Sequence, residues 1–264
     1  MDLKSSGAVI NTAFSTLPLD QFMISPHPDY LKLVGAIEND KSLDLAVLIP
    51  MPQVINKYVA ENGFSRFIIK STKDIMLVLL NLKMLVLVVG RFIKKPYFRY
   101  LGFYLYFLSL IRIIKNEMSL YNVNPRTICL HNLMTDIILA SNNRIALAAF
   151  VDATLDSKVE SVLITQNPVR LVEQLKREGI YHVTLCFSFN QLGYMVNPDL
   201  NSVIKMMSEE KTRFKFWAMQ IIASGKIKVE DLDISIFDDF EAILVASKKL
   251  NRIEELVYAF ENYK

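Results

Sequence analysis

The chain has 264 residues, of which 52% are hydrophobic, and its 30 basic and 27 acidic residues leave a formal net charge of +3. This length suits one domain with a large core. No long basic stripe alternates with aromatic residues, which argues against a nucleic-acid partner. The two cysteines, Cys129 and Cys186, lie in apolar stretches. We therefore expect buried thiols rather than a disulfide or a zinc or iron–sulfur site.

Residues 1–11 lack the apolar core and the small-residue cleavage site of a secretory signal, so we expect a cytoplasmic protein. The chain has eight glycines and many isoleucine, lysine and tyrosine residues, a thermophile-like composition.

Eight short segments have the residue pattern of β-strands. The clearest covers residues 181–188, where bulky apolar residues at 183, 185 and 187 alternate with small, semi-polar ones at 184, 186 and 188. In the same way, Ile128 and Leu130 are predicted to face helices, while residues 127, 129 and 131 face inward. In chain order the predicted strands are 8–11, 43–49, 67–70, 127–131, 161–165, 181–188, 214–220 and 242–246.

Helices are predicted between most of these strands. Ser25-Pro26 supplies a cap and a first-turn proline for a helix that ends near residue 38. Asn167-Pro168 begins another helix, which Gly179 ends. Residues 134–152 are predicted to form one helix, although 145–150 are also compatible with an extra strand. Helices are further expected at 198–210 and 249–261.

Eight strands, each followed by a helix, predict a single closed parallel (β/α)8 barrel over residues 1–264. The alternative is an open doubly wound sheet, which is disfavoured because no glycine-rich loop follows the first strand. Asn-Pro helix starts, the turn at 190–193 and the strand end at 218–220 lie within residues 161–264. This half resembles archaeal-type (β/α)8 barrels of unassigned function. The resemblance implies a fold and no catalytic residue.

Residues 73–121 interrupt this pattern and are predicted to be an apolar helical insertion after the third strand. Two apolar runs, 75–90 and 98–114, flank a basic and aromatic stretch. Both are shorter than the roughly 20 apolar residues that cross a membrane. A helix that is apolar on all sides needs a cover. We expect a second copy of the chain to cover the 75–114 helices and so to form a homo-oligomer; an apolar ligand beneath a lid and an anionic membrane surface are the two alternatives.

The carboxyl ends of the predicted strands carry polar residues, and in this fold active sites lie at those ends. His131 is predicted to be a catalytic acid or base, which Asp136 five residues later would orient. Lys70 is predicted to form a Schiff base with a carbonyl substrate. The residues expected to bind the substrate are Asn11, Gln166, Asn190 and Gln220. The competing interpretation is that such residues cap helices and face solvent, which explains Asn167.

Two loops, 222–226 and 245–249, follow the last two predicted strands. They resemble the phosphate-binding loops of (β/α)8 barrels, and this resemblance implies that Ser224, Gly225 and Ser247 contact a phosphate. Ala246 stands where those barrels carry a glycine.

The predicted function is an enzyme of the lyase or isomerase type, acting on a small organic substrate that is phosphorylated or carries a carbonyl. Two alternatives remain. One is a flavin- or nicotinamide-dependent oxidoreductase, because barrels hold these cofactors without a Rossmann motif. The other is a non-catalytic protein that uses residues 75–114 to bind a hydrophobic ligand or to form a homo-oligomer. No cofactor is assigned, and the few carboxylates at strand ends disfavour a divalent metal.

Overall fold

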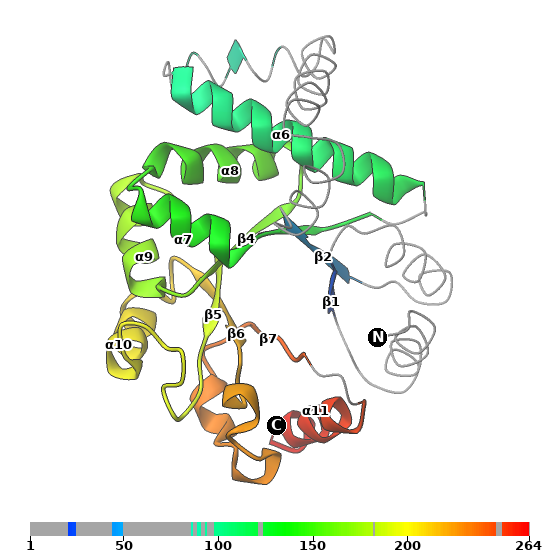
Figure 1. Ribbon diagram of the computed structural model, residues 1–264, viewed down its shortest axis with the longest axis vertical. Helices are drawn as coiled ribbons and strands as arrows, with labels where there is room; N and C mark the ends of the chain where they lie inside the picture. The colour runs from blue at the N-terminus through cyan, green and yellow to red at the C-terminus, as the bar shows by residue number, and fades with distance from the viewer. Residues whose placement is uncertain are drawn as a thin grey trace, which may run out of the picture.

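One all-parallel β-sheet organises the computed structural model, and its strands lie side by side in the order of the sequence (Figure 1). The structure describes residues 21–24, 44–49, 86, 89–90, 93, 98–120, 124–181, 183–246 and 250–263, to which all structural statements below refer. The strands are β1 (Gln21–Ile24), β2 (Asp44–Ile49), β3 (Thr127–Leu130), β4 (Glu160–Thr165), β5 (Thr184–Ser188), β6 (Lys215–Met219) and β7 (Ala242–Ile243).

Helices lie outside the arc that the strands form, and α6 crosses α8 as a further layer (Figure 1). The helices are α6 (Phe98–Ser119), α7 (Asn132–Ala140), α8 (Arg144–Asp156), α9 (Pro168–Arg177), α10 (Leu200–Glu210) and α11 (Leu250–Tyr263). Three short 3-10 turns lie between β6 and β7, namely η1 (Ala223–Gly225), η2 (Val229–Asp231) and η3 (Ile234–Phe237).

The predicted alternation of the strands is confirmed by two separate groups of buried side chains. Leu185 and Phe187 of β5 belong to the large core between the sheet and the helices. Cys186 belongs to a smaller cluster on the inner face of the sheet, together with Cys129 of β3 and Trp217 of β6. Both cysteines are buried free thiols, as predicted. The sheet is thus covered on both faces, as is usual for parallel strands.

The prediction of a closed eight-stranded barrel is wrong. Six strands of four to six residues and the two-residue β7 form an open, curled sheet, in which β1 and β7 are the two edges of the described part (Figure 1). In the predicted barrel, the strand at 67–70 lies between β2 and β3. These two strands instead pair directly, with Ile49 opposite Leu130. The predicted strands at 8–11 and 67–70 lie outside the described residues.

Two further elements differ from the prediction. Residues 134–152 are divided between two helices, α7 and α8, because the chain turns at Ser141 to Asn143, where Asn142 adopts a φ of +50°. The alternative strand at 145–150 is wrong, because these residues are helical.

The predicted end of α9 at Gly179 is confirmed. Gly179 has a φ of +65°, and the Ile180 N–H donates to the Leu175 carbonyl at 2.9 Å, which is the hydrogen bond of a Schellman motif.

The second apolar run of the predicted insertion, 98–114, lies in α6 and is largely covered by the chain itself. Buried residues of α6 recur every three or four positions and form a stripe: Tyr100, Tyr104, Phe107, Ile111, Ile114 and Met118. This stripe faces α8, where Phe107 contacts Phe150 edge-to-face with ring centroids 5.3 Å apart. The hydroxyl of Tyr100 donates to the Asp152 carboxylate at 2.6 Å. None of the described helices has the length and hydropathy needed to cross a membrane.

Candidate functional site

Four of the predicted site residues follow consecutive strands at the carboxyl edge of the sheet. His131 follows β3, Gln166 follows β4, Asn190 lies two residues after β5, and Gln220 follows β6. Because neighbouring parallel strands end at the same edge, the topology places these residues along one rim, as predicted. Asn11, Lys70 and Ser247, the other predicted site residues outside the 222–226 loop, lie outside the described residues.

His131 joins the end of β3 to the start of α7. Its backbone N–H donates to the Ile49 carbonyl at 2.8 Å and so continues the β2–β3 pairing. Its side chain is the N-cap of α7, where Nδ1 accepts a hydrogen bond from the Leu133 N–H at 3.1 Å. Partial burial lowers the pKa of the imidazole from its ordinary value. The ring is therefore mainly neutral at pH 7, and because Nδ1 accepts, its proton lies on Nε2.

Asp136 does not orient the imidazole as predicted, since its carboxylate is occupied by the next strand. Oδ1 accepts from the Thr165 hydroxyl at 2.6 Å, and Oδ2 accepts from the Gln166 N–H at 3.1 Å. The Thr165 Oγ1 in turn accepts from the Asn167 N–H at 2.9 Å. Asn167 caps α9 by accepting from the Arg170 N–H at 3.3 Å. This chain of hydrogen bonds fastens α7 to the end of β4 and holds the rim in shape.

The ends of β5 and β6 are connected by a second set of hydrogen bonds. The Ser188 hydroxyl donates to the Gln220 Oε1 at 2.9 Å. Asn190 is completely buried, and its Nδ2 donates to the carbonyl oxygens of Tyr194 at 2.9 Å and Gln220 at 3.3 Å. Its Oδ1 accepts from the Tyr194 N–H at 2.9 Å. The Asn190 amide thus supports the rim from within, whereas Gln220 is half-exposed.

Further contacts join the loops that follow these two strands. Gln191 Nε2 donates to the Asp231 carbonyl at 2.8 Å, and Gln191 Oε1 accepts from the Asp233 N–H at 2.8 Å. The Lys226 Nζ lies 3.8 Å from the centroid of the Tyr194 ring, a cation–π distance. These contacts hold two loop segments together next to the carboxyl rim, residues 190–196 and residues 220–233.

The 222–226 loop uses its backbone donors internally. Ala223, Ser224 and Gly225 all have positive φ values. The N–H groups of Ala223, Gly225 and Lys226 donate to carbonyl oxygens within the turn. The N–H groups that would hold a phosphate are therefore largely occupied, so this geometry gives the predicted contacts of the exposed Ser224 and Gly225 no support.

The inner face of the sheet carries a polar group that the sequence analysis did not identify. Trp217, the single tryptophan of the chain, is 4% exposed, and its indole N–H has no hydrogen-bond partner among the described residues. It opposes Cys186 across the β5–β6 pair. Burial raises the pKa of Cys186 to about 12. The pKa of Cys129 is also raised, mainly by burial and in second place by the nearby Cys186. Both therefore remain protonated and unreactive at neutral pH.

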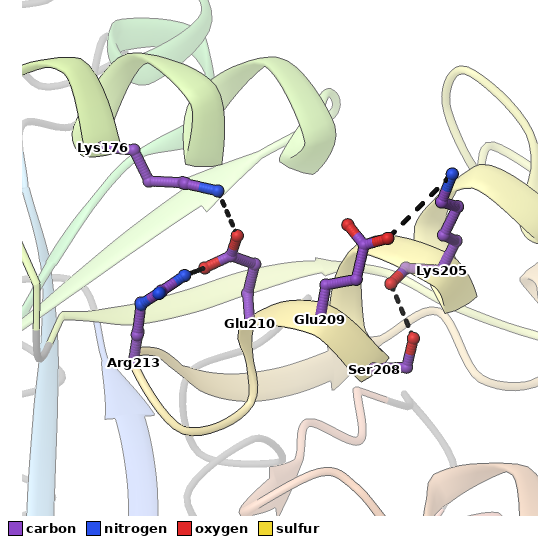
Figure 2. Close-up of polar contacts among 6 residues, drawn as sticks. All are labelled: Lys176, Lys205, Ser208, Glu209, Glu210 and Arg213. Carbon is purple, nitrogen blue, oxygen red and sulfur yellow. Dashed lines mark hydrogen bonds and ion pairs between the residues drawn. The ribbon is translucent and has the colours of Figure 1, made fainter.

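Another polar cluster lies where α10 leads into the amino end of β6. Figure 2 shows the Glu210 carboxylate between Lys176 of α9 and Arg213 of the turn before β6. Glu210 is 3% exposed. Residues at this end of parallel strands typically serve stability rather than catalysis, and we assign this cluster a structural role.

Two observations complete the description of the site. The described residues contain no group of three or more histidine, cysteine, aspartate or glutamate side chains that could hold a metal ion. Comparison with protein-family models, curated proteins and solved structures finds no match. The carboxyl rim is therefore the part of the described structure that bears on function.

Proposed function

We propose that the carboxyl rim binds a small carbonyl compound and that the Nε2–H of His131 donates a hydrogen bond to the carbonyl oxygen. The observation that carries this proposal is the acceptor role of Nδ1 in capping α7. A neutral imidazole held in this tautomer presents a donor at a strand end without a full positive charge. Such a donor stabilises the negative charge that develops on a carbonyl oxygen when a water molecule or hydroxide ion takes a proton from the adjacent carbon, to which solvent later returns one.

The reaction class that fits this arrangement is proton transfer next to a carbonyl, as in isomerases and lyases. Gln166 follows β4 and Gln220 follows β6, and the half-exposed side chains of these two residues are proposed to position the substrate. Lys70, outside the described residues, is kept as the donor of an alternative route, because a Schiff base with Lys70 would expel as water the carbonyl oxygen that His131 is proposed to bind. Asn190 is assigned to supporting the rim, because its amide group is buried and hydrogen-bonded within the loop.

Solvent exchange tests this proposal without knowledge of the product. The protein is incubated in D2O with a panel of 2-oxo acids, hydroxyketones and aldoses, and the loss of each proton next to the carbonyl is followed by 1H NMR. We expect catalysed exchange for at least one compound. A loss of roughly 100-fold or more is expected in His131→Asn, which removes the Nε2 donor.

His131→Asn is informative because asparagine is itself a strong N-cap, so α7 keeps its side-chain acceptor. His131→Ala removes both the cap and the donor and serves as the comparison for stability. Absence of exchange across the panel, or unchanged exchange in His131→Asn, would contradict the proposal.

A second candidate function is the non-catalytic binding of an apolar molecule on the inner face of the sheet. Among the described residues, the indole N–H of Trp217 has no acceptor, and half-buried apolar side chains surround its cluster: Met23, Leu48, Met219, Ala242 and Leu244. A ligand with one acceptor would satisfy the indole. Saturable quenching of tryptophan fluorescence by a ketone such as cyclohexanone would support this candidate, and a linear response across the titration would count against it.

A further inference from the structure

Apolar side chains are exposed on the described part of the segment before α6. Val86, Val89 and Ile93 are helical and are 65%, 48% and 73% exposed. Their spacing of three and four residues is that of side chains on one side of a helix. The buried stripe of α6 packs on α8, whereas these three side chains face solvent. They thus form an apolar surface, which we call the 86–93 face.

The sequence around this face is strongly basic. Residues 75–116 contain seven of the 30 basic residues of the chain and none of its 27 acidic residues. Arg91, Lys94 and Lys95 lie within or next to the 86–93 face in sequence, and the exposed Arg99 lies in the first turn of α6. The rest of the chain carries more acidic than basic residues, so the positive charge of the protein is concentrated here.

We propose that the 86–93 face binds the surface of an anionic lipid bilayer. Apolar side chains on one side of a helix enter the boundary between headgroups and acyl chains, while neighbouring lysine and arginine side chains contact lipid phosphates. Each basic residue close to such a surface adds to the electrostatic attraction at moderate ionic strength. The proposed contact is with the surface of the bilayer; among the described helices, none meets the requirements of a membrane span.

The charge distribution favours an anionic lipid surface over two other partners, a second copy of the chain and a nucleic acid. A symmetric dimer through this face would bring the same basic residues of both copies together, and like charges across an interface oppose association. A nucleic acid would match the charge. Its phosphate backbone would leave the side chains of Val86, Val89 and Ile93 in water, so their exposure would remain unexplained.

Vesicle co-sedimentation of the full chain tests the proposal. We expect binding to vesicles of phosphatidylcholine with 30% phosphatidylserine at low salt. Pure phosphatidylcholine should bind at least tenfold less, and 0.5 M NaCl should release the protein. The double variant Val86→Ser/Ile93→Ser should weaken binding at least tenfold, as should Lys94→Gln/Lys95→Gln/Arg99→Gln.

Matched controls use exposed residues elsewhere on the surface. Leu155→Ser and Leu192→Ser change side chains that are 66% and 58% exposed, and Lys205→Gln removes an exposed charge on α10. These variants should bind vesicles like the parent protein. The proposal is overturned if the parent protein stays in the supernatant at low salt, or if it binds neutral and anionic vesicles equally. Loss of a dimer in Val86→Ser/Ile93→Ser, without vesicle binding by the parent, would assign the face to a second copy.

Discussion

At the scale of single residues, Glu210 is the clearest case of a buried charge compensated by its neighbours. Burial by itself would raise the pKa of Glu210, but hydrogen bonds and charges from Lys176 and Arg213 outweigh this effect and lower the pKa below its ordinary value (Figure 2). The two cations keep contact with water, with side-chain exposures of 42% and 52%. The carboxylate thus joins α9, α10 and the turn before β6.

We predict that Glu210→Gln lowers the free energy of unfolding by about 1–3 kcal/mol at pH 7, because the neutral amide loses two charged hydrogen bonds. A group with a lowered folded pKa stabilises the protein above its unfolded pKa, and this contribution disappears as the pH falls through the folded pKa. The difference between parent and variant should therefore shrink in acid. Urea unfolding at pH 7 and pH 3.5 measures both values.

Glu209→Gln is the matched control on the same helix. Its side chain is 59% exposed and lies 4.0 Å from Lys205, so its loss should change stability by less than about 0.5 kcal/mol. Equal effects of the two substitutions would show that burial of Glu210 is not what makes its ion pairs matter.

The His131 cap has its own pH dependence. Burial lowers the pKa of His131 in the folded protein, so folding favours the neutral imidazole that caps α7. This contribution to stability is complete above about pH 6.5, the ordinary pKa, and is lost as the pH falls through the folded pKa. We predict that His131→Asn matches the parent in stability at pH 8 and becomes relatively more stable at pH 5. Comparing the two proteins cancels the other histidines. A constant difference between pH 8 and pH 5 would exclude this role.

Sequence reasoning located His131 on the rim but assigned its polar contacts incorrectly. The alternation of residues 127–131 was enough to predict a strand end there. Which atom the imidazole would engage depends on where α7 begins, and histidine is not a characteristic N-cap. Glu210 was missed because Glu209 and Glu210 are adjacent in sequence, and the depth of each depends on helix packing.

At the scale of elements, the packing of α6 on α8 explains how an aromatic helix is accommodated. Small residues of α8, among them Ala146, Ala149 and Ala153, are fully buried and leave room for larger side chains. Phe107 of α6 meets Phe150 edge-to-face, an arrangement favoured by the charge distribution of aromatic rings. The helix pair therefore belongs to the same hydrophobic core as the outer face of the sheet.

We predict that Phe107→Ala lowers the free energy of unfolding by about 3–5 kcal/mol, because it leaves a cavity at a fully buried aromatic contact. The matched variant Phe103→Ala, on the same helix but half-buried, should cost clearly less. Chemical denaturation of the two variants gives the comparison. Similar losses would show that the stripe facing α8 is not the main packing surface of α6.

The elements predicted well from sequence were those with a strong local period. Residues 181–188 and the helix ended by Gly179 are examples, since alternation and end residues are local properties. The strand β1 was missed because its short run Phe22–Ile24 directly precedes Ser25-Pro26, which was assigned to a helix start. The predicted insertion of a strand between β2 and β3 was wrong because pairing partners are set by the whole fold rather than by periodicity.

At the scale of the whole molecule, the sheet that the described residues form is open, and its strands differ in how well they are protected. The interior strand β5 is buried at every position and pairs on both sides. The short edge strand β7 is half-buried and pairs in the described structure with β6 alone. A closed barrel would remove this difference, because closure leaves no edges.

Hydrogen exchange of the native protein tests the open architecture. We predict that backbone amides of β5 exchange slower by orders of magnitude than those of Ala242 and Ile243 in β7, because edge strands open by local fluctuation. Mass spectrometry of peptides covering the two strands gives the comparison within one sample. Equal protection of β5 and β7 would instead indicate a sheet closed by a further strand.

The sequential order of the strands has a consequence for biosynthesis. From β3 to β7, each new strand pairs with the one made just before it, so every βα unit has a docking place as soon as it leaves the ribosome. An open sheet needs no final closing step between its first and last strands. The carboxyl rim can therefore be assembled piece by piece during translation, with His131 in place before Gln220 has been synthesised.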